Sequence, residues 1–270
     1  MNQKPLDLSC VFELEPHGPD TYVGESPRYE WERIYGGLVV AQALRAATYT
    51  VRPEHAVHSL HAYFILGGDL GEPVRYEVDR VRNGRSFTTR RVVARQSAGA
   101  ILTLECSFQK QEDGPDTQSA DMPAGVPPPD TLAPIWDAGI ERADFTRTHT
   151  TPSSMTWARF PWKLGVEQAL HACALAYLSD MNAMDAIVAS RAGGAAPGQA
   201  WGGDWMGVSI DHAVWFHRPA RADDWLLLDF TGHGLIRTRG LATGLVFDRS
   251  GTHVATIAQE GLLRMRKPGG

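Results

Sequence analysis

The first half of the chain changes from a helical to an alternating spacing of apolar residues. From Leu38 to Val51 the apolar side chains recur at intervals of three and four residues, and Pro53 follows this run. The pair Gly36-Gly37 precedes it. This spacing predicts a helix over 38–51, because a period near 3.6 gathers the apolar side chains on one face. The many small residues would let the helix lie close against a sheet.

Four segments with strand-like patterns follow the predicted helix. In one of them Val74, Tyr76 and Val78 alternate with charged residues. Asn83-Gly84 and Ser97-Ala98-Gly99 supply turns between the later segments. The predicted strands cover residues 59–66, 74–79, 86–96 and 100–109. The first half therefore reads as one helix followed by an antiparallel meander.

A change of composition divides the chain. Residues 111–134 contain five acidic residues, six prolines and two glycines, without apolar periodicity. Such a segment is typical of a surface linker. We therefore expect an N-terminal unit over 1–110, a Pro-rich acidic linker over 111–134 and a C-terminal unit over 135–270.

The second unit repeats features of the first. Gln42–Ala47 is similar to Gln168–Cys173 at an offset of 126, and Ser59-Leu60-His61 matches Ser209-Ile210-Asp211 at an offset of 150. The agreement of helix and strand patterns indicates a duplication. The difference of 24 between the offsets indicates an insertion after the second helix, with Ala192–Gly198 as its core.

Composition and charge narrow the function. Hydrophobic residues make up 43% and charged residues 21% of the 270 residues, as in a globular protein, and the net charge of −5 argues against nucleic acid as a partner. Cys10, Cys106 and Cys173 form neither a disulfide framework nor a zinc motif. No apolar run is long enough for a membrane span, and no signal peptide is evident, so we expect a cytoplasmic protein without a membrane partner.

The common signatures of catalytic nucleophiles and phosphate loops do not occur in the sequence. His58 and His61 lie at odd spacing on a predicted strand, and so do His212 and His217. Their side chains would therefore point to opposite faces, which disfavours a shared metal. We assign these histidines packing or hydrogen-bonding roles.

Three polar residues interrupt the apolar pattern of the second unit. Asp180 lies where the second helix should end, next to the negative end of the helix dipole, so its carboxylate needs either solvent or a specific task. Ser209 begins a predicted strand that runs to His217, and Gln259 lies within the last one. Taken singly, each is an ordinary polar residue at a helix end or in a strand.

Five segments, in chain order, closely resemble the type II acyl-CoA thioesterases. They are Tyr35–Leu44, His58–Phe64, Ser86–Arg91, Asp211–Pro219 and Gln259–Leu262. The resemblance runs from Tyr35 to Arg266. It implies an α+β double hotdog fold, in which two repeats each wrap a long antiparallel sheet around a central helix. It further implies an enzyme that hydrolyses acyl-CoA to a carboxylic acid and CoA, without cofactor or metal, and that forms homo-oligomers.

The resemblance also assigns the site. The aspartate of the family's catalytic group falls on Asp180, its hydroxyl residue on Ser209 and its glutamine on Gln259, all chemically intact. Asp180 would act as general base on a water that Ser209 and Gln259 orient. Backbone N–H groups at Gly36 and Gly37 are candidates for binding the substrate oxyanion, although tight helix packing explains the two glycines equally well.

The duplication predicts one active site, in the second unit. It pairs Glu54 with Asp180, Ser59 with Ser209, and Phe108 or Gln109 with Gln259, so the first set would be decayed. The first unit would then support the structure and form part of the substrate channel.

Two alternatives remain open. A hotdog enoyl-thioester hydratase or dehydratase would carry a Gly-Asp-x-Asn-Pro-x-His motif, and Asp180–Asp185 lacks its Gly, Pro and His. A non-catalytic acyl-CoA-binding module would not need all three polar residues. Ile65–Asp69 and the insertion depart from the family pattern, which affects the acyl specificity more than the reaction type.

Overall fold

The computed structural model describes residues 8, 11–145, 152–191 and 205–265. The core of the predicted insertion, Ala192–Gly198, lies outside the described residues. The helices are α1 (Gly36–Thr48), α2 (Gln168–Ser179) and α3 (Ala183–Ala189), with a 3₁₀ turn at Pro129–Thr131. The strands of the first half are β1 (Glu15–Pro16), β2 (Thr21–Gly24), β3 (His55–Phe64), β4 (Val74–Asn83), β5 (Phe87–Gln96) and β6 (Gly99–Lys110). Those of the second half are β7 (Ile135–Asp137), β8 (Ile140–Asp144), β9 (Ser153–Arg159), β10 (Trp205–Ser209), β11 (Asp211–Phe216), β12 (Leu226–Ile236), β13 (Arg239–Asp248) and β14 (His253–Met265).

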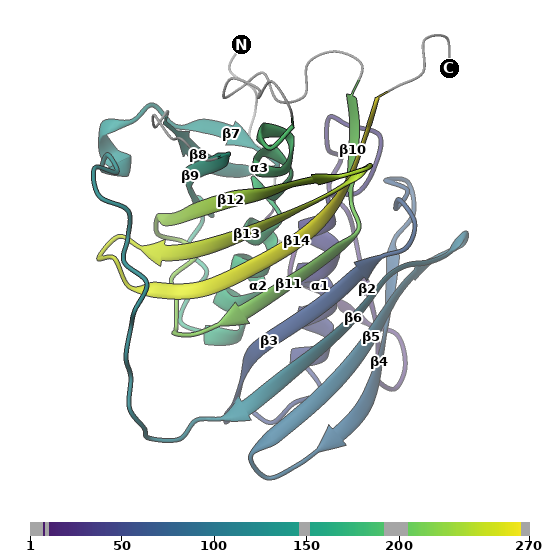
Figure 1. The fold of residues 1–270 in the computed structure, drawn as a ribbon. Coiled ribbons are helices and arrows are strands. Elements are labelled where there is room, and N and C mark those ends of the chain that lie inside the picture. The colour runs from purple at the N-terminus through teal and green to yellow at the C-terminus, as the bar shows by residue number, and fades with distance from the viewer. Residues whose placement is uncertain (1–7, 9–10, 146–151, 192–204, 266–270) are drawn as a thin grey trace.

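All described strands join one antiparallel sheet. Their order is β1-β2-β4-β5-β6-β3-β11-β14-β13-β12-β9-β8-β7, with β10 paired to β14. The two halves meet where β3 pairs with β11, at Tyr63 opposite Asp211 and Ser59 opposite Trp215. Helices α1 and α2 lie together against one face of the curved sheet (Figure 1). Each half is thus a helix wrapped by its own meander, as predicted.

The first half differs from the predicted pattern at its helix ends and at its N-terminus. Helix α1 ends at Thr48, three residues before Val51, because the Thr48 and Thr50 hydroxyls donate to the carbonyls of Arg45 and Ala47 and close the last turn. Strands β1 and β2 were not predicted, since runs of two and four residues are too short to show alternation.

The second half contains two features that periodicity does not reveal. Helix α3 follows α2 after Asn182, whose positive φ of 24° turns the chain between the two helices. The strand predicted from Ser209 to His217 is interrupted at Ile210, so β10 and β11 are separate strands, both paired with β14. The interruption changes which way the Ser209 side chain faces relative to the side chains of β11.

The break at Ile210 corrects the predicted alignment of the two halves. In the β3–β6 pair, Val57 lies opposite Phe108 and Ser59 lies opposite Ser107. Strand β3 therefore has one extra residue, His58, at this point. Strand β14 pairs Gly261 with Ser209 and Ala258 with Ala213, so three steps along β14 match four steps through β10 and β11, with the extra residue at the break. Ser209 therefore corresponds to Val57, and the predicted pairing of Ser209 with Ser59 is wrong.

The same correspondence corrects the other two pairings. Gln259 lies two residues before Gly261, so its counterpart in β6 is Cys106, two before Phe108. Asp180 is the first residue after α2 and corresponds to Tyr49, the first after α1, not to Glu54. The Gln-Ala-Leu match misled the alignment because Gln42 lies in the middle of α1, whereas Gln168 begins α2.

The two long helices run antiparallel and pack on small residues. At one end Arg45 of α1 forms an ion pair with Glu167, just before α2. At the other end the Tyr35 hydroxyl donates to the Tyr177 carbonyl across 3.0 Å. Six alanines of the two helices have no solvent exposure: Ala41, Ala43, Ala46, Ala47, Ala174 and Ala176. None of the described helices is both long and apolar enough to cross a bilayer.

Candidate active site

Three elements bring the predicted group together. Asp180 directly follows α2, Ser209 ends β10, and Gln259 lies in β14. The Ser209 hydroxyl lies 3.5 Å from Asp180 Oδ1, and Gln259 Nε2 donates to Ser209 Oγ across 2.7 Å. Because the β10–β14 pairing places Ser209 opposite Gly261, the side chains of Ser209 and Gln259 meet beneath the end of α2.

A buried chain of hydrogen bonds extends behind Gln259. His212 Nδ1 lies 2.6 Å from Gln259 Oε1, and His212 Nε2 lies 2.7 Å from the Ser179 hydroxyl. Since an amide oxygen only accepts, we assign the ring proton to Nδ1, which leaves Nε2 as an acceptor. The single hydroxyl proton of Ser179 lies within reach of both Nε2 and the Ala176 carbonyl oxygen, at 2.7 Å and 2.8 Å. Burial lowers the pKa of His212 to about 4, which keeps the ring neutral and fits this tautomer. Gln259 must then turn its NH₂ group toward Ser209.

Asp180 is the carboxyl group that Ser209 and Gln259 contact. Burial raises the pKa of its carboxyl to about 7, while hydrogen bonds from the Gln259 side chain, the Gly37 N–H and the Ser209 hydroxyl act in the opposite direction. Removing a carboxylate from water disfavours its charged form, and donors restore part of that stability. The carboxyl can therefore both lose and accept a proton near neutral pH.

The glycine pair at the start of α1 lies against this carboxyl. A Cβ on Gly36 would be 2.7 Å from Asp180 Oδ2, and one on Gly37 would be 2.5 Å from the Tyr177 carbonyl oxygen. Neither position has room for a side chain. The Gly37 N–H is used by Asp180, so the close packing and the polar role of these glycines occur together. The positive end of the α1 dipole points at the site.

A small cavity opens beside Asp180. Its volume is about 260 Å³, and its walls include Trp31, Tyr35, Met184 and Asn182. Asn182 donates from Nδ2 to the Ser154 hydroxyl across 2.8 Å, whereas its buried Oδ1 has no partner among the described residues. The cavity walls thus combine aromatic and thioether groups with charged side chains, since Asp137, Arg142 and Asp185 line the cavity as well as Asp180.

Sequence reasoning missed the supporting role of Ser179 and His212. His212 was assigned a packing or hydrogen-bonding role, and it does form hydrogen bonds, but its link to Gln259 was not foreseen. Ala213 lies opposite Ala258, and the residues next to this pair, His212 and Gln259, are joined by a hydrogen bond. This contact depends on the break at Ile210, and the pattern of apolar residues does not reveal that break.

The other histidines singled out in the sequence lie elsewhere. His58 Nε2 lies 2.8 Å from the Ser107 hydroxyl, His61 packs edge-on against Trp215, and His217 Nε2 lies 2.8 Å from the Thr256 hydroxyl. Within the described parts of the chain, no three His, Cys, Asp or Glu side chains are grouped as metal ligands would be.

Comparison with known proteins decides the family. The sequence profile of the acyl-CoA thioesterase N-terminal domain matches residues 27–109, and that of the C-terminal domain matches residues 111–263. The chain belongs to the acyl-CoA thioesterase family. It is 31% identical to acyl-coenzyme A thioesterase 8 of Mus musculus over 96% of this chain and 89% of that protein. It is 30% identical to acyl-CoA thioesterase 2 of Haemophilus influenzae over 96% of this chain and 97% of that protein.

Solved structures agree with this assignment. The crystal structure of an acyl-CoA thioesterase II from Mycobacterium marinum superposes with a TM-score of 0.81 at 32% identity, covering 97% of this chain and 98% of that one. A hot dog fold protein from Alicyclobacillus acidocaldarius superposes with a TM-score of 0.77 at 18% identity, covering 96% and 98% of the chains. The α+β double hotdog fold is confirmed, and this thioesterase is a thioester hydrolase.

Proposed function

We propose that this thioesterase hydrolyses acyl-CoA through a water held by Asp180, Ser209 and Gln259. The observation that carries the proposal is the convergence of these side chains on a carboxyl whose pKa of about 7 suits a general base. A base titrating near the working pH combines a useful ionised fraction with sufficient basicity. Asp180 alone of the three can take a proton from water.

The reaction follows from these roles. Asp180 takes a proton from the water while the water oxygen attacks the thioester carbon, forming a tetrahedral oxyanion. The carbon–sulfur bond then breaks, the thiolate of CoA leaves with its electron pair, and the protonated Asp180 supplies the proton that gives the thiol. Ser209 and Gln259 restrict the orientation of the water, which lowers the entropic part of the barrier. The products are the carboxylic acid and CoA.

We place the developing oxyanion at the start of α1. Backbone N–H groups there point along the helix dipole toward the site, and glycine allows the substrate carbonyl to approach closely. The Gly37 N–H already donates to Asp180, so Gly36 is the better candidate in the free enzyme. Proton transfer to Asp180 weakens its hold on Gly37 and would free this second donor as the oxyanion forms.

The structure gives a reason to prefer hydrolysis over hydration. A hydratase of this fold would pair its carboxylate with a histidine acting as acid or base. His212 is hydrogen-bonded to Gln259 of the group, and its other ring nitrogen lies against the Ser179 hydroxyl. Its lowered pKa also keeps it neutral. His212 therefore positions Gln259 and does not exchange protons with substrate.

A panel of acyl-CoA thioesters, assayed for release of free thiol, tests the proposal. Hydrolysis should persist in excess chelator, because Asp180, Ser209 and Gln259 supply the base and the orientation without a metal. Binding without thiol release would favour the non-catalytic module, and water addition to an enoyl-CoA without thiol release would favour the hydratase. Loss of hydrolysis in chelator with recovery on adding zinc would overturn the mechanism.

A further inference from the structure

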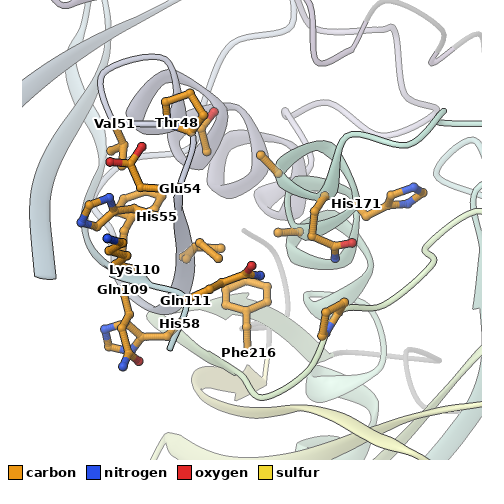
Figure 2. A pocket seen from close by; sticks show the side chains of 18 of the residues that line it. Thr48, Val51, Glu54, His55, His58, Gln109, Lys110, Gln111, His171 and Phe216 are labelled. Carbon is orange, nitrogen blue, oxygen red and sulfur yellow. The ribbon is translucent and has the colours of Figure 1, made fainter. Parts of the chain in front are cut away.

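A second, larger cavity lies at the other end of the helix pair. Its volume is about 920 Å³, and it opens where α1 ends and α2 begins, between these helices and strands β3 and β11. Figure 2 shows its lining, with Thr48 from the end of α1, Val51 from the segment after it, His171 from α2, and Phe216 from β11. The proposed active site lies at the opposite ends of the same two helices.

The position of this cavity in the fold mirrors that of the active site. Tyr49, Val57 and Phe108 line it, and they are the counterparts of Asp180, Ser209 and Gly261 in the other half. A phenol ring, an isopropyl group and a benzyl group stand where the carboxyl, the hydroxyl and a glycine stand in the active site. The cavity therefore keeps the place of a hotdog substrate site but lacks the base and the hydroxyl.

The lining combines apolar side chains with the imidazoles of His55, His58 and His171 inside, and it is charged at the rim. Phe108 and Leu175 are almost fully buried, and Val57 and Phe216 are partly buried. The exposed charged residues of the rim carry both signs: Arg52, Glu54, Lys110, Glu112 and Asp113. This distribution suits a molecule with an apolar tail and a polar, solvated head. The volume is within the range of small-molecule sites, about 300–1,000 Å³.

One buried polar side chain in the lining is unsatisfied. His55 is 7% exposed, and neither of its ring nitrogens has a hydrogen-bond partner among the described residues. Figure 2 places it between Glu54 and Lys110 in the cavity wall. An unpaired buried imidazole costs free energy that a hydrogen bond from a bound molecule would recover.

We propose that this cavity binds the acyl chain of a second substrate or product molecule and does not hydrolyse it. The choice of ligand rests on the proposed function, since acyl-CoA and the released acid are the amphipathic molecules that this enzyme would meet. The binding itself rests on the cavity and its place in the duplicated fold. An occupied cavity would bridge the end of α1 and the start of α2, which also hold the active site at their far ends.

Binding stoichiometry tests this inference. The full chain is titrated calorimetrically with S-dodecyl-CoA, a thioether that cannot be hydrolysed, and separately with dodecanoate. Wild type should bind two thioether molecules or, if the free acid is the ligand of the cavity, one thioether and one dodecanoate. Ala169→Trp, which fills the cavity from the first turn of α2, should remove one bound molecule and retain hydrolysis at the active site.

Two further variants make the result decisive. Val166→Trp places the same side chain three residues away at a position that is 94% exposed and outside the cavity lining, so it should bind as wild type does. Ala56→Trp fills the cavity from β3 and should repeat the loss if Ala169→Trp does not fold. A wild-type total of one molecule, or an unchanged total in both cavity variants, would overturn the inference. Because the titration does not depend on turnover, failure of hydrolysis would be seen separately.

Discussion

At the scale of single residues, Asp180 is held between two opposing influences. Burial disfavours its charge, whereas Ser209, Gln259 and the Gly37 N–H stabilise it. His212 and Ser179 act one step further away, because they fix the orientation of the Gln259 amide. Because its charged form is only partly stabilised, the carboxylate remains basic, and its burial lowers the stability of the folded protein.

Substitutions of Ser209 and Gln259 should lower turnover only when they remove the group that orients the water. Ser209→Thr keeps the hydroxyl and should retain most of the activity, whereas Ser209→Ala and Gln259→Ala should each lower kcat by about 10- to 100-fold, since a misplaced water costs that much. Steady-state kinetics on one acyl-CoA, with circular dichroism to verify folding, measures this. The double variant should lose much less than the product of the single losses, because the two residues hold one water. Full additivity would contradict a shared water.

The elevated pKa of Asp180 predicts that the base destabilises the fold. A carboxyl whose pKa rises from 3.8 to about 7 on folding costs nothing below pH 4, and its cost grows as the pH rises toward 7. At pH 8 the free energy of unfolding of Asp180→Asn should therefore exceed that of wild type by about 2–4 kcal/mol, and its melting temperature should be higher. The difference should vanish near pH 4. Equal melting temperatures of wild type and Asp180→Asn at pH 8 would show that burial of the Asp180 carboxylate does not destabilise the fold.

At the scale of elements, the site depends on how closely the start of α1 approaches the end of α2. Gly36 leaves room for Asp180 Oδ2 and for the ring of Phe64, and Gly37 leaves room for the carbonyl of Tyr177. At this end the backbone of α1 therefore lies close to the end of α2, with the Tyr35 ring packed beside Gly37. This contact sets the distance between the base and the helix dipole.

A methyl group at Gly36 should disturb the site and leave the fold intact. In Gly36→Ala the Cβ would lie 2.7 Å from Asp180 Oδ2, so the carboxyl must move, and kcat should fall by about 10- to 100-fold. Alanine favours helix, so the melting temperature should change little. Gly114→Ala, where no atom lies within 4 Å of the added Cβ, is the matched control and should behave as wild type. Native turnover in Gly36→Ala would remove α1 from the mechanism.

The helices and strands could be predicted from the sequence more reliably than the alignment of the first half with the second half. The period of 3.6 located α1, and the position of Asp180 at the end of α2 followed from the apolar run. Ile210 is apolar and fits either strand, so the break that turns Ser209 toward Gln259 had no local signal. The predicted pairing of Glu54 with Asp180 was wrong because the similar Gln-Ala-Leu segments lie at different positions in the two helices, in the middle of α1 and at the start of α2.

At the scale of the whole molecule, one sheet joins both halves. Strand β3 pairs with β6 on one side and with β11 on the other, so neither half has a free edge there. Helix α1 likewise buries one face on α2. The proposed catalytic group comes from the second half, while the first half supplies Gly36 and Gly37 across the contact.

Residues 1–110 expressed alone should therefore aggregate. The fragment would expose the edge of β3 and the apolar face of α1, both of which the second half covers in the full chain. Size-exclusion chromatography and thermal melting check this, with the full chain as control. A monomeric fragment with a cooperative melt would show that the first half folds independently.

The turnover of Asp180→Asn tests the central claim most directly. The amide keeps the shape of the side chain and one hydrogen-bond acceptor but cannot take a proton from water. With an acyl-CoA that wild type hydrolyses, kcat should fall by roughly 100-fold or more while KM changes little. Near-native turnover in a folded Asp180→Asn protein would contradict Asp180 as the base.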